Sequence, residues 1–267
     1  MSTVRPAQRG LLFLGCLLAF VRWEPAPYDL FLIIIFLLYA RGLTWKSYQL
    51  VFVVLLGPLL FTHVPALGAA LEVAPERTLY YSLVTLYLAL SSVFFMSLPE
   101  RSVPLLLLGY EVGALLSGLL GVLAFLRIPG LEDLLWGGSR AVAFFKDPNV
   151  FGAFLIPALF LALARLEQGR KFWILPALIL FLGVLVSLSR GAWANFAVAL
   201  LAWWLLRPRK RIWLPLVLLT LAGGVGISVV VMPDNPIVQR LGFMPYDKER
   251  FFTQMEALSL ALTQPLG

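Results

Sequence analysis

Long runs of apolar residues, separated by short polar connections, make up most of the chain. These runs are continuous rather than alternating. A run that crosses about 30 Å of hydrocarbon must be helical or part of a closed barrel, because lipid cannot satisfy backbone polar groups. Barrel strands alternate apolar and polar residues, so the continuous runs favour helices. The pattern predicts an all-α polytopic membrane protein with about nine transmembrane helices, at 10–22, 28–40, 49–67, 78–98, 103–126, 150–166, 172–189, 191–206 and 212–232.

The tail that follows residue 232 has a different pattern. Apolar residues there recur on one helical face, which predicts a short amphipathic helix at the outer membrane interface. We therefore expect a transmembrane bundle over 1–232 and, over 233–267, the incomplete start of a periplasmic loop that contains this helix. The residues on the apolar face are Phe251, Phe252, Met255, Leu258 and Leu262.

Composition and charge support a membrane protein and predict its orientation. The chain is 61% hydrophobic and 13% charged, whereas about a quarter of the residues of a soluble domain are charged. With the N-terminus inside, most lysines and arginines fall in cytoplasmic connections, as the positive-inside rule requires. The net charge of +7 therefore predicts an orientation and not a nucleic-acid partner. In this orientation the 127–149 connection and the turn at Arg190 both face outward.

Two arginine-bearing segments at this outer end carry the candidate chemistry. Arg140 precedes Asp147-Pro148-Asn149, which opens the sixth helix with an N-cap and a proline at the first helical position. The alternative interpretation is that this tripeptide serves only to cap the helix. The second segment is the short turn before the eighth helix, which begins at Gly191.

Together these features predict an anion site. Backbone amides at two helix N-termini favour an anion, and a guanidinium fork binds two phosphate oxygens at once, which suits a diphosphate. The alternative for Arg190 is a snorkelling arginine at a helix end. We expect Arg140 and Arg190 to lie close enough to share one diphosphate.

Two further polar residues stand out. Glu111 lies within the fifth span, where a carboxylate is a functional residue, a neutral carboxyl group or the partner of an arginine. His63, the one histidine, is either a general base or a hydrogen-bonded interfacial residue. One histidine and the single Cys16 do not form a metal constellation, so we expect no metal and no cofactor.

A family resemblance rests on the two arginine segments. One runs from Arg140 to Gly152 and the other from Ser187 to Ala192. Together they resemble the O-antigen ligase/polymerase family of bacterial membrane glycosyltransferases. The stretch from Arg250 to Gly267 is similar to the place where that family enters its large periplasmic loop. The resemblance covers residues 135–267, and the earlier spans match only in general pattern.

The resemblance implies an enzyme of lipopolysaccharide or polysaccharide biosynthesis in the bacterial inner membrane, with its active face in the periplasm. Its partners would be membrane lipids, a glycan linked to undecaprenyl diphosphate and a glycan acceptor such as the lipid A core. The arginines matching Arg140 and Arg190 would be catalytic, binding the diphosphate and stabilising it as the leaving group. We expect substrate binding by Asp147, Asn149, Ser189 and Gly191.

The family's catalytic histidine lies beyond its large periplasmic loop, and this sequence ends before any matching position. We therefore expect a truncated chain or an inactive remnant of the family. A small-anion transporter is the alternative function. The sequence does not specify the glycan, the acceptor, the choice between ligase and polymerase, or the oligomeric state.

Overall fold

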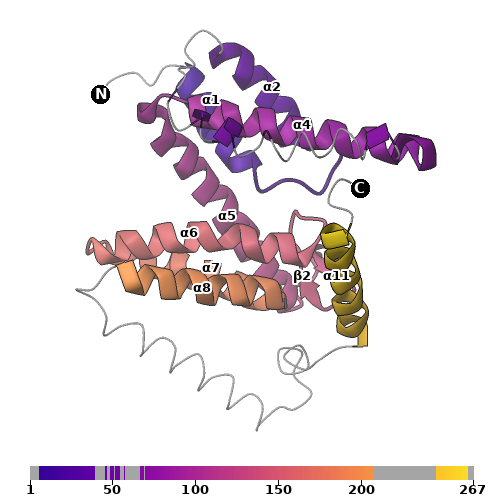
Figure 1. Ribbon diagram of the computed structural model, residues 1–267. Helices are drawn as coiled ribbons and strands as arrows, with labels where there is room; N and C mark the ends of the chain where they lie inside the picture. Colours follow the sequence, from indigo (N-terminus) through magenta and orange to yellow (C-terminus); the bar gives the residue numbers. More distant parts are fainter. Residues whose placement is uncertain are drawn as a thin grey trace. The chain divides into compact units, whose positions relative to one another are not determined.

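The protein is described by a computed structural model at residues 6–39, 46, 49–50, 52–54, 57, 67–68, 70–206 and 245–263. Most of these residues are helical (Figure 1). The predicted span at 49–67 lies mostly outside the described residues, and the span at 212–232 and the boundary at residue 232 lie wholly outside them. The chain divides into two compact units, Met1–Ile35 with Pro104–Phe243 and Phe36–Val103 with Met244–Gly267.

The described helices follow the apolar runs, with 3₁₀ turns at several of their ends. The 3₁₀ turns are η2 (Glu100–Ser102), η3 (Glu132–Leu134) and η4 (Lys171–Trp173), and a two-stranded antiparallel hairpin is formed by β1 (Leu135–Trp136) and β2 (Arg140–Ala141). The α-helices are α1 (Pro6–Leu17), α2 (Pro27–Tyr39), α4 (Pro75–Ser97), α5 (Val103–Phe125), α6 (Pro148–Glu167), α7 (Ile174–Val186), α8 (Arg190–Leu206) and α11 (Pro245–Thr263).

Among the described residues, three helical stretches are long and apolar enough to cross a membrane. They are α4, the continuous stretch Glu100–Phe125 and α6. The helices α2 and Lys171–Val186 are apolar but shorter, and a straight span needs about 20 residues. A membrane protein with three candidate spans is what the structure supports, and the predicted number of nine is not confirmed.

The first unit has its core around α6. This helix packs against both α7 and α8, and the three lie side by side in Figure 1. Phe151, Leu155 and Leu159 recur on α6 at intervals of four residues and are fully or almost fully buried. Because side chains four residues apart lie on one helical face, a single face of α6 supplies this part of the core. Leu180 and Val184 of α7 belong to the same cluster.

Glycines let α1 and α5 approach closely within the first unit. A Cβ atom added at Gly109 of α5 would collide with the backbone carbonyl oxygen of Leu12 in α1, and one added at Gly113 would lie 2.5 Å from the carbonyl oxygen of Cys16. Small residues at a spacing of four allow the backbones of membrane helices to touch. The Gly109 and Gly113 pair therefore determines the separation of α1 and α5.

Helix α1 ends before the apolar run does. The run predicted a helix to residue 22, but α1 ends at Leu17, and Phe20 stacks on Phe144 at 4.5 Å between ring centroids. The backbone N–H of Val21 donates to the carbonyl oxygen of Phe144 at 3.1 Å. The loop after α1 thus hydrogen-bonds and stacks with Phe144, which is distant in the sequence. Local hydropathy does not predict such a tertiary contact.

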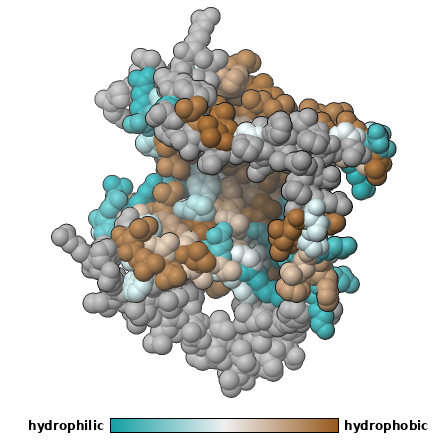
Figure 2. Space-filling view, in the orientation of Figure 1, coloured by the Kyte–Doolittle hydropathy of each residue, from teal (hydrophilic) through white to brown (hydrophobic). Residues whose placement is uncertain are grey.

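The second unit contains α4 and α11. Gln49 is fully buried, and its side-chain amide donates to Ser97 Oγ at 2.6 Å and to the carbonyl oxygen of Val93 at 3.3 Å. The predicted helix in the tail is confirmed as α11, which begins at Pro245 and exposes its apolar residues, including 69% of Phe252. Brown hydrophobic residues cover much of the described surface in Figure 2. Such exposure is expected of helices whose solvent is lipid.

Candidate anion-binding site

A short hairpin positions Arg140, the first candidate residue. Trp136 of β1 pairs with Arg140 of β2, and the N–H of Ser139 donates to the carbonyl oxygen of Trp136 at 3.2 Å. Gly137 and Gly138 have φ values of +56° and +67°. Two consecutive residues with positive φ suit glycine, because other side chains are strained there. The hairpin therefore holds Arg140 where the chain turns back toward the helical core.

Arg140 connects the hairpin to two helix ends. Its Nε donates to the carbonyl oxygen of Ser187 at 3.1 Å, and its Nη2 donates to Asn149 Oδ1 at 3.1 Å. Ser187 follows the last residue of α7, whereas Asn149 lies in the first turn of α6. Two bonds from different nitrogens fix both the direction and the plane of the guanidinium group. The half-buried side chain is thus oriented by the core and not only by its own hairpin.

The start of α6 is capped as the sequence predicts. Asp147 is the N-cap residue, and its carboxylate accepts from the backbone N–H of Asn149 at 2.6 Å, while Pro148 occupies the first helical position. A carboxylate at this place satisfies an amide that has no partner within the helix. The capping interpretation of Asp147 is therefore confirmed. A role for Asp147 or Asn149 in substrate binding remains a prediction.

The turn between α7 and α8 is buried and held by its own hydroxyl groups. Ser187 Oγ donates to the carbonyl oxygen of Val184 at 2.7 Å and accepts from the N–H of Ser189 at 3.3 Å. Ser189 Oγ accepts from the N–H of Ala192 at 3.1 Å, which is the geometry of an N-cap. Leu188 between them has a φ of +48°. Helix α8 begins at Arg190, one residue before the predicted start at Gly191.

Close packing joins this turn to α6. A Cβ atom added at Gly152 would lie 2.6 Å from Ser187 Oγ and 2.7 Å from the Cβ of Ala192. The first turns of α6 and α8 are therefore in direct contact at Gly152. Arg190 comes three residues after Ser187, a separation of at most about 11 Å between Cα atoms. The structure thus brings Arg140 onto the turn that leads into Arg190, at the end of the bundle where two helices begin.

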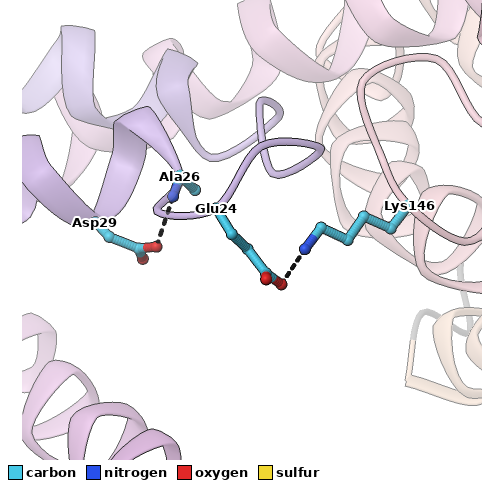
Figure 3. Close-up of polar contacts among 4 residues, drawn as sticks. All are labelled: Glu24, Ala26, Asp29 and Lys146. Carbon is cyan, nitrogen blue, oxygen red and sulfur yellow. Dashed lines mark hydrogen bonds and ion pairs between the residues drawn. The ribbon is translucent and has the colours of Figure 1, made fainter.

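The loop that follows α1 lies at this same end. Arg22 Nη1 donates to the carbonyl oxygen of Asp133 at 2.7 Å, and Lys146 forms an ion pair with Glu24 (Figure 3). The carboxylate of Asp29 accepts from the N–H of Ala26 at 3.1 Å, so the start of α2 is capped beside this loop. The loop 20–24 thus contacts the segment 133–147 at several points.

A second charged pair lies elsewhere in the bundle. Arg165 Nη2 of α6 lies 2.6 Å from Glu111 Oε2 of α5, and the Glu111 side chain is 4% exposed. The Arg165 guanidinium also lies over the Trp173 ring, 4.1 Å from the ring centroid. Of the three interpretations of Glu111, partnership with an arginine is the one observed. No local motif marks Arg165 as the partner, so the sequence alone does not identify it.

His63 lies outside the described residues. Within the ranges that the structure does describe, no three His, Cys, Asp or Glu side chains are grouped so that they could hold a metal ion. Comparisons of the chain with protein families, with curated proteins and with solved structures found no match.

Proposed function

We propose that the end of the bundle containing Arg140 and Arg190 binds the diphosphate of a lipid-linked glycan. The observation that carries the proposal is the hydrogen bond from Arg140 Nε to the Ser187 carbonyl oxygen, since it joins the two arginine segments. The starts of α6 and α8 add the positive ends of two helix dipoles. Guanidinium groups bind phosphate oxygens in pairs, so an oriented arginine suits a diphosphate.

The corresponding reaction is the transfer of a glycan from undecaprenyl diphosphate to an acceptor hydroxyl. The bond between the anomeric carbon and the phosphate oxygen breaks, and its electron pair leaves with the diphosphate. The acceptor oxygen forms the new glycosidic bond and loses its proton to a general base. Arg140 and Arg190 stabilise the charge that develops on the leaving diphosphate, an effect worth several kcal/mol in a preorganised site.

This proposal extends to location and partners. The three candidate spans support a membrane protein, and we place it in the bacterial inner membrane with Arg140 on the periplasmic face. The glycan acceptor is the lipid A core or a similar carbohydrate, and the process is the biosynthesis of lipopolysaccharide or a related polysaccharide. Transport of a small anion would require a polar route through the membrane centre. Glu111 is a polar residue within the fifth span, but its partner is Arg165, so we do not propose transport.

Binding of undecaprenyl diphosphate in lipid nanodiscs, measured by native mass spectrometry, tests the function. We expect Arg140→Ala to weaken binding about 10- to 100-fold, the range for a hydrogen bond to a charged group. Arg127→Ala is the matched control, because Arg127 is an exposed arginine of the connection between α5 and the hairpin. Equal affinities of the Arg140→Ala variant and the wild type would refute the proposal. Equal losses of affinity in the Arg140→Ala and Arg127→Ala variants would show that binding depends on general charge attraction, which would also refute a specific site at Arg140.

Cysteine labelling in intact cells tests the orientation. The chain has one cysteine, Cys16, so a Cys16→Ser background carries a single new thiol in each variant. Ser139 is exposed in the hairpin turn, and Gln168 is exposed just after the end of α6. We expect an impermeant maleimide to label Ser139→Cys and to leave Gln168→Cys unlabelled until the cells are opened. The reverse result would place Arg140 in the cytoplasm and exclude a periplasmic site.

A further inference from the structure

We propose that Trp136 is the surface on which the sugar attached to the diphosphate stacks. This inference rests on the proposed function, since it assigns a subsite beside the same arginine. Trp136 pairs directly with Arg140 across the hairpin. Directly opposed residues of an antiparallel pair project to the same face, with Cβ atoms about 4.5–5.5 Å apart. Trp136 and the arginine that would hold the diphosphate are therefore neighbours on the hairpin.

The two residue pairs of the hairpin differ in burial, and Arg140 opposite Trp136 is half-buried. Ala141 is fully buried and its partner Leu135 is partly buried, whereas Trp136 is 54% exposed. A Cβ atom added at Gly137 or Gly138 would meet no atom within 4 Å. Two of the three turn residues beyond Trp136, Gly137 and Gly138, thus have no side chain and have open space beside them. An exposed tryptophan in this position has room for a flat ligand on its outer side.

The chemistry of a sugar beside a diphosphate matches this placement. A pyranose ring has a face of C–H groups with partial positive charge, and the face of an aromatic ring is electronegative. Tryptophan has the largest such face of the protein side chains and loses little conformational freedom on binding. Since the first sugar is bonded directly to the diphosphate, it must lie within a few ångströms of the arginine that binds those phosphates. Trp136 satisfies this requirement through its register with Arg140.

An exposed tryptophan also serves as an anchor at a membrane interface. Trp23 offers a matched comparison, because it is 53% exposed in the loop after α1 and has no strand partner in the hairpin. An interfacial anchor would affect the binding of any lipid ligand equally, whether or not its headgroup carries a sugar. A sugar subsite contributes only when the ligand carries a sugar. The two roles therefore differ in their dependence on the probe.

The experiment compares two probes in nanodiscs, undecaprenyl diphosphate and the same lipid bearing one N-acetylglucosamine. We expect Trp136→Ala to weaken binding of the sugar-bearing probe about tenfold and to leave the sugar-free probe unchanged, which also shows that the variant is folded. Trp136→Phe should retain most of the affinity, and Trp23→Ala should bind both probes as the wild type does.

The outcomes separate the two proposals. If Trp136→Ala weakens both probes equally, or neither, or if Trp23→Ala has the same effect on the sugar-bearing probe, the sugar subsite is refuted while the diphosphate site stands. If the wild-type protein binds neither probe, or if Arg140→Ala binds the sugar-free probe as well as the wild type does, the diphosphate site itself is refuted, and the sugar subsite with it.

Discussion

Replacing Arg165 with methionine tests the buried ion pair most directly. The substitution keeps a long unbranched side chain and removes the cation that contacts Glu111. The side chains of the pair are 23% and 4% exposed for Arg165 and Glu111, respectively, so the carboxylate has little access to water. An ionised carboxylate that loses its partner in such a place is strongly destabilising. We therefore expect Arg165→Met to lower the free energy of unfolding markedly.

The size of the effect follows from two contributions. Breaking a buried pair by removing one partner costs about 3–5 kcal/mol. The guanidinium also stacks on Trp173 at 4.1 Å, and such a cation–π contact contributes about 0.5–2 kcal/mol. Arg165→Lys retains the charge but loses the planar group, so its cost should fall well below that of Arg165→Met. Glu111→Gln combined with Arg165→Met removes both charges and should recover much of the loss.

Equilibrium unfolding in mixed micelles, with tryptophan fluorescence as the signal, measures these differences. Arg170→Met is the control, because Arg170 is an exposed arginine close by in the chain and its loss should change stability by less than about 0.5 kcal/mol. A double-mutant cycle on Glu111 and Arg165 isolates the energy of their interaction. If Arg165→Met and Arg170→Met have equal effects, or if the cycle gives no coupling, the ion pair does not stabilise the fold.

Three further predictions use the same unfolding measurement. Gly109→Ala should cost about 1–3 kcal/mol, because its Cβ collides with the Leu12 carbonyl oxygen and α1 must move away; an unchanged midpoint would contradict the close packing of α1 and α5. Asp147→Ala should cost about 1 kcal/mol through loss of the α6 cap, and Asp147→Asn, which still caps, should cost less. Lys146→Ala should cost less than about 1 kcal/mol, since the paired side chains of Lys146 and Glu24 are 46% and 67% exposed, and added salt should reduce even that difference.

The long helices could be predicted from the sequence because their determinants are local. The expected spans 78–98, 103–126 and 150–166 correspond to α4, α5 and α6 within three residues at each end. An apolar run sets the length of such a helix, and a proline in the first turn, as in α4 and α6, helps to set its start. Where a tertiary contact sets the end of a helix, the local sequence does not predict that end. The early end of α1, whose following loop packs against Phe144, is an example.

The candidate site also has some features that the local sequence predicts and others that depend on contacts between distant residues. The cap of α6 by Asp147 follows from three adjacent residues, so the sequence predicts it. The bond between Arg140 and Ser187 joins positions 47 residues apart, and it depends on a hairpin of only two residues per strand that has no hydrophobic periodicity of its own. The Glu111 partner is equally remote in sequence. A small-residue spacing such as that of Gly109 and Gly113 is a local signal that does indicate a helix contact.

Arg140 and Arg165 differ in the chemistry of their contacts. Arg165 lies against a carboxylate and an aromatic face, an arrangement that offsets its charge within the fold. The hydrogen bonds from Arg140 to Ser187 and Asn149 go to neutral oxygens, which orient a guanidinium group without adding an opposing charge. A guanidinium group with a fixed direction can hold a bound anion in place, as we propose for Arg140. Removal of Arg165 should therefore appear mainly in unfolding, and removal of Arg140 mainly in diphosphate binding.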